Sequence, residues 1–166
     1  MFDQILGLPA HPLIVHLAVV LTPLLVLVGA AYALAPRVRA VTAWAVVLLA
    51  VAAPAAVLAA KESGESLKRA RFTGVGGPLG ARVAVHEGFA TPLLLSAAGL
   101  AAACLALVYA TTPARGSLTS DRFGRPVTLV LSALTVVLAV VAGYFCFRAG
   151  DSGARAVWAA AGLTGV

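Results

Sequence analysis

Residues 13–35 read LIVHLAVVLTPLLVLVGAAYALA, a run without any Asp, Glu, Lys or Arg. A helix of about 20 predominantly apolar residues is long enough to cross a bilayer. Three further runs reach this length, at about residues 40–60, 85–111 and 126–147, and Lys or Arg stands in every gap between the runs. The pattern predicts an all-α fold, in which residues 1–166 form a single four-helix transmembrane bundle.

The composition supports a membrane protein. Of the 166 residues, 61% are hydrophobic and only 11% are charged, which is too few charged residues to cover a soluble domain. The net charge of +6 comes from Lys and Arg, but these residues lie between the apolar runs and form no dense basic face, so no nucleic-acid partner is expected. We expect a multi-pass protein of the cell inner (plasma) membrane, with the lipid bilayer as its main partner.

Ionisable residues gather at one end of the predicted bundle, which we call the histidine surface. Consecutive spans alternate in direction, so the starts of the first and third runs meet the ends of the second and fourth. The ionisable residues at these four ends are His11, His16, Glu62, Glu65, His86, Glu87, Arg148, Asp151 and Arg155. Such residues are costly at bilayer depth and are commonly functional, so this surface is the predicted functional site.

The orientation in the membrane is predicted from the basic residues. Arg37 and Arg39 lie in the short turn after the first span, where positive charge favours the cytoplasmic side. A raw count of basic residues favours the reverse orientation, because the longer connection at residues 61–84 is also rich in them. We give the short turn more weight and expect the histidine surface on the outer side.

The stretch HPLIVH at residues 11–16 carries two of the three histidines. Pro12 suits the first helical position, which makes His11 the predicted cap and places His16 in the second turn. Their side chains then point about 140° apart on a regular helix, so they do not form an i,i+4 chelating pair. His16 and His86 are expected at similar depth on different helices, as the axial ligands of a b-type haem must be.

The same histidines also suit a transition metal. His11, His16 and His86 are therefore the predicted ligands of a haem or of zinc, copper or iron, with His11 folding back to join the other two. Structural roles are the alternative: a buried histidine that donates to a backbone carbonyl, or an interfacial His–Glu pair formed by His86 and Glu87 and satisfied by water.

Further residues are predicted to support the site. Asp151 is expected to accept the second N–H of a histidine ring and so to fix its tautomer. Arg148 and Arg155 are expected either to bind a carboxylate such as a haem propionate or to reach the interface beside the aromatic anchor Trp158. Glu87 points about 100° round its helix from the preceding histidine and supports the site from that side.

The connections give further expectations. Residues 61–69 are predicted to extend the second helix, with an i,i+4 ion pair between Glu65 and Arg69. Residues 73–80, rich in glycine, are predicted to be irregular. Gly150 is predicted to cap the fourth helix, and Ser152 and Gly153 to turn the chain after it.

Prolines and cysteines complete the pattern. Pro23, Pro54 and Pro92 each remove a backbone donor and favour a kink. Cys104 and Cys146 are expected at different depths, which excludes a disulfide between them. We see no internal repeat in the sequence.

Four motifs together resemble a bacterial integral membrane family, catalogued as domain of unknown function 2231. They are His11-Pro12-x-x-x-His16, Ser63-Gly64-Glu65-Ser66-Leu67, His86 at the head of the third span, and Gly150-Asp151-Ser152-Gly153-Ala154. The resemblance covers nearly the whole chain and implies a four-helix membrane protein. Some members are joined to redox domains such as Rieske proteins, which favours electron transfer. Many members have histidine where this chain has Asp151, so a fourth histidine ligand is not expected.

Three functions remain open from the sequence. The first is a haem- or metal-binding protein that transfers electrons between the quinone pool and a membrane redox partner. The second is a proton-coupled carrier of a small solute, for which four spans are few unless the chain forms a homo-oligomer. The third is a structural or assembly subunit of a membrane complex. No nucleophile, base and orienting residue stand at readable spacing, so at most a redox enzyme subunit is expected.

Overall fold

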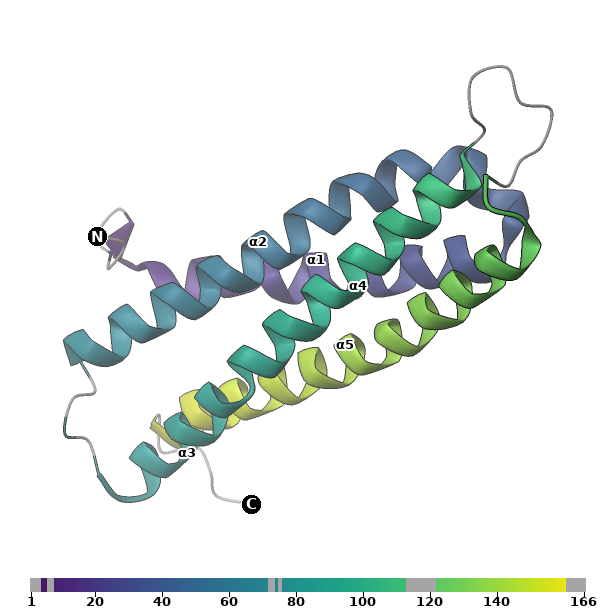
Figure 1. The fold of residues 1–166 in the computed structure, drawn as a ribbon. Helices are drawn as coiled ribbons and strands as arrows, with labels where there is room; N and C mark the ends of the chain where they lie inside the picture. The colour runs from purple at the N-terminus through teal and green to yellow at the C-terminus, as the bar shows by residue number, and fades with distance from the viewer. Residues whose placement is uncertain (1–3, 6–7, 72–73, 75, 113–121, 161–166) are drawn as a thin grey trace.

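The computed structural model describes residues 4–5, 8–71, 74, 76–112 and 122–160. In chain order its elements are β1 (Gln4–Ile5), β2 (Leu8–Pro9), α1 (Ala10–Leu34), a 3-10 turn (Pro36–Val38), α2 (Arg39–Arg71), α3 (Gly77–Gly88), α4 (Ala90–Thr111) and α5 (Arg125–Ala160). The two short strands form a small antiparallel ladder before α1, and the rest of the described chain is almost entirely helical (Figure 1).

Four helical stretches are long and apolar enough to cross a membrane, and this confirms the predicted four-helix bundle. They are Ala10–Leu34, Pro36–Ala70, Gly77–Thr111 and Arg125–Trp158. Large apolar side chains point outward from them, and Trp44 is 70% exposed and Phe147 71% exposed. Such a surface suits contact with lipid rather than water. The chain is therefore a multi-pass membrane protein by its helices and their composition.

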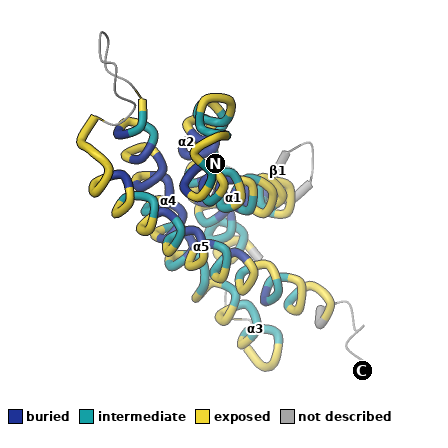
Figure 2. Tube along the Cα trace, turned by 90° about the vertical axis from the view of Figure 1, so that its right-hand side faces the viewer, coloured by how far each residue is buried: buried dark blue, intermediate teal, exposed yellow. Residues whose placement is uncertain are grey.

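The core lies where the four long helices meet. Leu25, Leu100 and Leu107 are fully buried there, and the buried faces of α1, α2, α4 and α5 turn toward one another (Figure 2). Ala53 and Ala142 are also fully buried. Small side chains at these positions let α2 and α5 approach their neighbours closely, as helices in lipid commonly do.

Two helices run further than a single membrane crossing requires. α2 continues to Arg71, which confirms the predicted extension, and Glu65 pairs with Lys61 and, at 3.9 Å, with Arg69. α5 continues to Ala160, so the predicted cap at Gly150 and the turn after it were wrong. α3 packs beside this end of α5, and that contact supports helix where glycines alone favour a stop.

The third span is broken close to its start. Phe89 separates α3 from α4, and its N–H donates to the His86 carbonyl at 3.1 Å. Pro92 has no N–H to offer the carbonyl of Gly88, which weakens the helix at this point. α3 already begins at Gly77, so the irregular stretch predicted for residues 73–80 was wrong from that residue on. The break holds His86 at the end of α3, beside α5.

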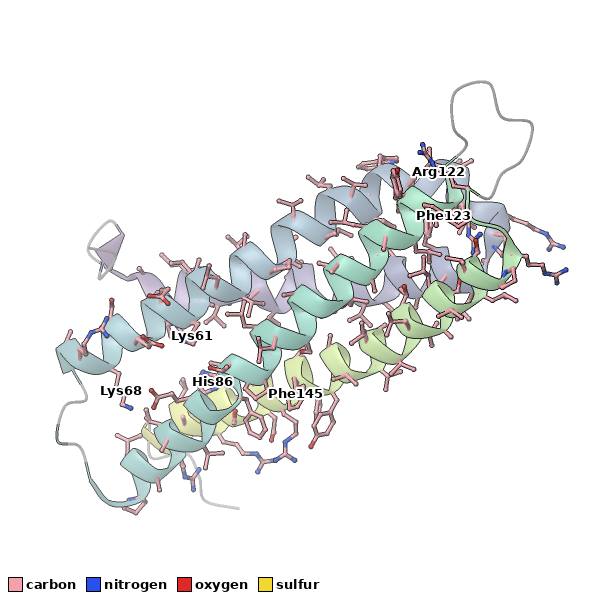
Figure 3. All side chains as sticks on the ribbon, viewed as in Figure 1. Lys61, Lys68, His86, Arg122, Phe123 and Phe145 are labelled. Atoms are coloured by element: carbon pink, nitrogen blue, oxygen red, sulfur yellow. The ribbon has the colours of Figure 1, made fainter. Side chains whose placement is uncertain are left out.

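All four ends predicted to meet do lie together. α1 and α4 both start at the end of the bundle that carries α3, and α2 and α5 return to it (Figure 1). At the opposite end, the Tyr32 hydroxyl lies 2.8 Å from the Thr111 hydroxyl, and Arg39 Nε donates to the Tyr32 carbonyl at 3.0 Å. There Arg122 also lies over the Tyr109 ring, 4.5 Å from its centre (Figure 3). These contacts tie the helix ends together away from the histidine surface.

Replacing Gly29 with alanine is expected to destabilise the bundle, because the added Cβ would lie 2.8 Å from Cys104 Sγ. Overpacking of this kind costs about 1–3 kcal/mol, measured as a lower free energy of unfolding in detergent. Gly99→Ala is the matched control, since its Cβ would meet Leu138 at an ordinary 3.7 Å. Adding Cys104→Ala to Gly29→Ala should recover the lost free energy of unfolding, because it removes the sulfur that the new Cβ would meet. Equal stability of the two glycine variants would contradict this packing.

Candidate functional site

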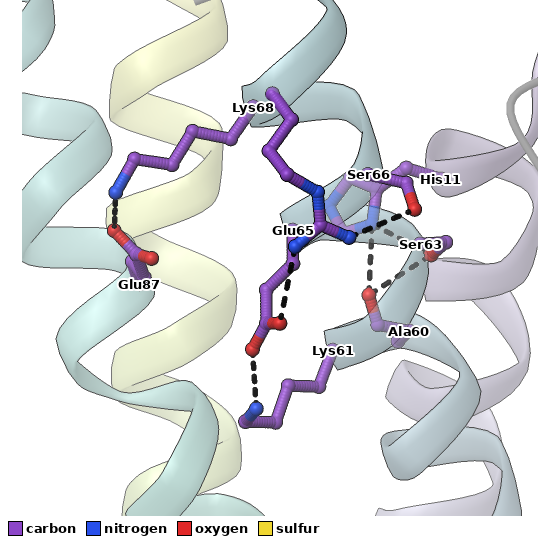
Figure 4. A network of polar contacts seen from close by, with 9 residues as sticks. His11, Ala60, Lys61, Ser63, Glu65, Ser66, Lys68 and Glu87 are labelled. Atoms are coloured by element: carbon purple, nitrogen blue, oxygen red, sulfur yellow. Dashed lines mark hydrogen bonds and ion pairs between the residues drawn. The ribbon is translucent and has the colours of Figure 1, made fainter. Parts of the chain in front are cut away.

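His11 lies in the first turn of α1 and reaches across to α2. Its Nδ1 is 3.0 Å from the Ala60 carbonyl oxygen and 3.0 Å from Ser63 Oγ (Figure 4). The Ser63 hydroxyl itself donates to the same carbonyl at 2.9 Å. The histidine predicted to cap the helix is instead fastened to the neighbouring helix.

His86, near the end of α3 (Figure 3), makes the same set of contacts as His11, but with α5. Its Nδ1 lies 3.0 Å from the Ala149 carbonyl oxygen and 3.2 Å from Ser152 Oγ, both on α5. The Ser152 hydroxyl donates to the Ala149 carbonyl at 3.1 Å. Each histidine therefore bonds one carbonyl and one serine, one turn apart on the facing helix.

These contacts decide which nitrogen of each ring carries the proton. A carbonyl oxygen only accepts, so the Nδ1 atoms of His11 and His86 must both be donors. In a neutral ring the proton on Nδ1 leaves Nε2 with a free lone pair. Within the described part of the chain, neither Nε2 makes a hydrogen bond. Both rings therefore present a basic nitrogen suited to a metal.

A glycine beside each ring makes room for it. A Cβ on Gly64 would lie 3.0 Å from His11 Cε1, and a Cβ on Gly153 would lie 3.0 Å from His86 Cε1. Both distances are tighter than ordinary packing. Gly64 and Gly153 therefore serve the close approach of the imidazoles, and this explains why glycine stands within two continuous helices.

The two rings lie edge-on to each other in space. The ring centres of His11 and His86 are 6.5 Å apart, with an angle of 67° between the ring planes. Both rings are half-buried. We call His11 and His86 the paired-histidine site.

His16 does not join this site. It is exposed, and its Nδ1 lies 2.5 Å from the carbonyl oxygen of Pro12, one turn earlier in its own helix. The predicted pairing of His16 with His86 is therefore replaced by the pairing of His11 with His86. The expected difference in direction between His11 and His16 is seen, but α1 already begins at Ala10, and this turns the first histidine inward.

The predicted supporting residues lie around the pair without touching it. Asp151 accepts from Arg155 Nε at 2.9 Å, so its predicted role of orienting a histidine was wrong; a carbonyl and a serine fill that role. Glu87 pairs with Lys68 of α2 at 2.5 Å. The Arg148 guanidinium lies over the Phe89 ring, 5.0 Å from its centre.

Ion pairs surround the histidine surface on its α2 side. Lys61 bonds Glu65, and Lys68 crosses to Glu87 before the break in the third span (Figure 4). The Lys68–Glu87 pair joins α2 to α3 at the histidine surface. At the exposed surface each such pair adds little stability, so their effect is mainly to place charge around the site.

The site offers two histidines and no third side-chain ligand. Among the described residues, no group of three or more His, Cys, Asp or Glu is placed to hold a metal ion. Both cysteines are free and buried, and Cys146 packs among Ala18 and Val57 as the small buried residue expected of it. A metal centre here would have the two histidines as its protein ligands, and any further ligands would come from a bound cofactor or from solvent.

Sequence reasoning missed the partners of the histidines, namely Ala60, Ser63, Gly64, Ala149, Ser152 and Gly153. One signal was available. The stretches at residues 60–64 and 149–153 read AKESG and AGDSG, so each carries alanine, an acidic residue, serine and glycine at the same spacing.

Replacing Gly64 or Gly153 with alanine is expected to displace the adjacent imidazole, and any metal held by that ring should then bind about 10-fold or more weakly. Loss of an outer contact to a ligating histidine typically costs 10–100-fold. Gly150→Ala is the matched control, because a Cβ there meets nothing within 4 Å. The measurement is metal affinity of each purified variant. Unchanged affinity in both glycine variants would show that the rings do not need this room.

Comparison with known proteins adds no further assignment. No protein-family model, no curated protein and no solved structure matches the chain.

Proposed function

We propose that the chain is a membrane electron-transfer protein that binds a haem iron or another transition metal between His11 and His86. One observation carries the proposal: two imidazoles with ring centres 6.5 Å apart, each with Nδ1–H bonded to a carbonyl, which leaves the lone pair of Nε2 available to a metal. This outer hydrogen bond is the usual partner of a metal-bound histidine, because it fixes the tautomer and raises the basicity of the ring.

The setting supports a redox role for such a metal. His11 at the start of α1 and His86 near the end of α3 lie at one end of the bundle, where a lipid-soluble carrier and a partner at the membrane surface could both approach. A metal held here would supply one-electron chemistry, and two electrons passed in turn to an oxidised partner would convert one quinol to a quinone with release of two protons. Both rings are half-buried, and partial burial of a metal centre contributes to its redox potential. The inner membrane is the proposed location.

The Arg148 and Arg155 side chains belong to this proposal as a basic rim. Both stand on α5 next to the serine and carbonyl that hold His86. Guanidinium groups pair well with carboxylates such as the propionates of a haem. Glu87 and Asp151 already have basic partners, so they balance charge around the site rather than bind the metal.

The proposal is tested by the absorption spectrum and metal content of the protein purified in detergent. The expected result is iron or copper at a fixed ratio to protein, with a spectrum that changes on reduction by dithionite if haem is present. A folded preparation that stays colourless and free of metal, even after expression with added haem precursor and copper, would contradict the proposal. In that case the histidines are helix clamps, as in the structural-subunit alternative.

A further inference from the structure

The likeness between the surroundings of His11 and those of His86 continues along the helices that carry them. Each residue of α1 corresponds to the residue 75 positions later, in α3 for the first turn and in α4 beyond it, as His11 does to His86. Leu25 and Leu100 then correspond, and both are fully buried. Gly29 corresponds to Cys104, and these two positions lie against each other where α1 and α4 approach. Self-contact of corresponding positions is what an axis between the two helices requires.

The second helices correspond in the same way, with a shift of 89 positions that takes Ala60 to Ala149. The matched pairs agree in burial, with relative exposures of 0% and 0% for Ala53 and Ala142 and of 4% and 2% for Ala50 and Ala139. Packing agrees as well, since α1 packs on α5 and α2 packs on α4. The shift is larger for the second helices because the connection between α4 and α5 is longer than the tight turn between α1 and α2.

The bundle is therefore two helical hairpins related by an approximate two-fold axis along its length. No repeat is evident in the sequence, because one apolar residue type can replace another at lipid-facing and core positions, so the two hairpins share few identical residues. The positions that remain alike are the histidine and its alanine, serine and glycine partners. An approximate two-fold axis makes the two imidazoles equivalent, so a single ligand between them is held equally by both.

The distance between the rings indicates how they would hold a metal. With metal–nitrogen bonds of about 2.0–2.1 Å and a nitrogen 1.1 Å from its ring centre, two opposed imidazoles place their ring centres about 6.3 Å apart. A tetrahedral angle would bring the same centres to about 5.2 Å. The observed separation of the His11 and His86 ring centres is 6.5 Å, which allows ligands on opposite sides of one metal and is too large for a tetrahedral pair unless the rings move.

We infer that the paired-histidine site holds one metal centre per chain, on the two-fold axis, with the imidazoles of His11 and His86 as opposed ligands. Two centres accept this arrangement without a third protein ligand: the iron of a haem, whose porphyrin supplies four nitrogens, and two-coordinate copper(I). Zinc requires four ligands, and the described residues offer no such group. The inference rests on the proposed function and specifies its ligand.

The experiment titrates the metal-free full-length protein in detergent with hemin, with copper(I) against a coloured chelator, and with zinc. We expect saturation at one hemin or one copper per chain, with zinc bound at least 100-fold more weakly than the preferred centre. His11→Ala and His86→Ala should each lower that affinity by more than about 100-fold and to the same extent, because each removes a ligand rather than an outer contact. His16→Ala is the control and should titrate as the wild type does.

The outcomes separate the inference from the proposed function. If neither hemin nor copper binds to folded protein, both are contradicted. If one of them binds but only one of the two histidines matters, or if two centres bind per chain, the symmetric site is wrong while a metal-binding function stands. Zinc binding as tight as that of hemin or copper would also overturn the opposed geometry. A thermal unfolding profile like that of the wild type confirms that each variant is folded.

Discussion

His11→Ala is expected to abolish the proposed metal binding, whereas His16→Ala is expected to leave it unchanged. The two histidines belong to the same helix, but only His11 faces His86, with ring centres 6.5 Å apart. His16 is exposed and bonds back to its own helix. Loss of an outer hydrogen-bond partner alone costs 10–100-fold in metal affinity, so loss of the ligand itself should cost more than about 100-fold.

The measurement is the metal-to-protein ratio of each variant after identical purification in detergent. A stability control is needed, because His11 also joins α1 to α2 through Ala60 and Ser63. His11→Gln keeps a side-chain donor for those groups but offers no imidazole to a metal. Retention of the full metal content in both His11 variants, or its loss in His16→Ala, would contradict the assignment of the site.

Ala142→Leu is expected to have the largest effect on stability, at about 3 kcal/mol, the upper end of the range for overpacking. Ala142 is fully buried, with 0% relative exposure, in the core formed with Leu25 and Leu100. The added methylenes have no free space in an interior packed as densely as a crystal. The measurement is the free energy of unfolding in mixed micelles.

Two matched variants test the packing and the symmetry together. Ala53 is the counterpart of Ala142 in the first hairpin and is equally buried, so Ala53→Leu should cost a similar amount. Ala98 is exposed on α4, and Ala98→Leu should change stability by less than about 0.5 kcal/mol. A loss in the exposed variant as large as in the two buried ones would show that the lipid-facing side of α4 is an interface instead.

The fold could be predicted from the sequence because the signal for a membrane helix is strong. Uncharged apolar runs of spanning length, separated by arginine and lysine, leave few alternatives to four helices. The residues at which the helices end were harder to predict. Gly150 and Gly153 favour a stop by local preference, yet α5 continues through them because α3 packs beside it and His86 needs the space at Gly153.

The candidate site could be predicted only in part. That His11 and His86 lie at one surface follows from the alternation of the spans. Which of two histidines on α1 faces inward depends on the residue at which the helix begins, and His16 was favoured because Pro12 suggested a later start. The serines and carbonyls that hold the rings lie 49–66 positions away along the chain, so only the packing of the hairpins brings them together.

The most direct test of the central claim is X-ray absorption spectroscopy on the loaded protein, recorded at the edge of the metal that binds. The account predicts two histidine imidazoles per metal, with nitrogen atoms at about 2.0–2.1 Å, and the loss of one imidazole in either His11→Ala or His86→Ala. A wild-type centre with one imidazole or none would contradict the claim that His11 and His86 jointly hold the metal.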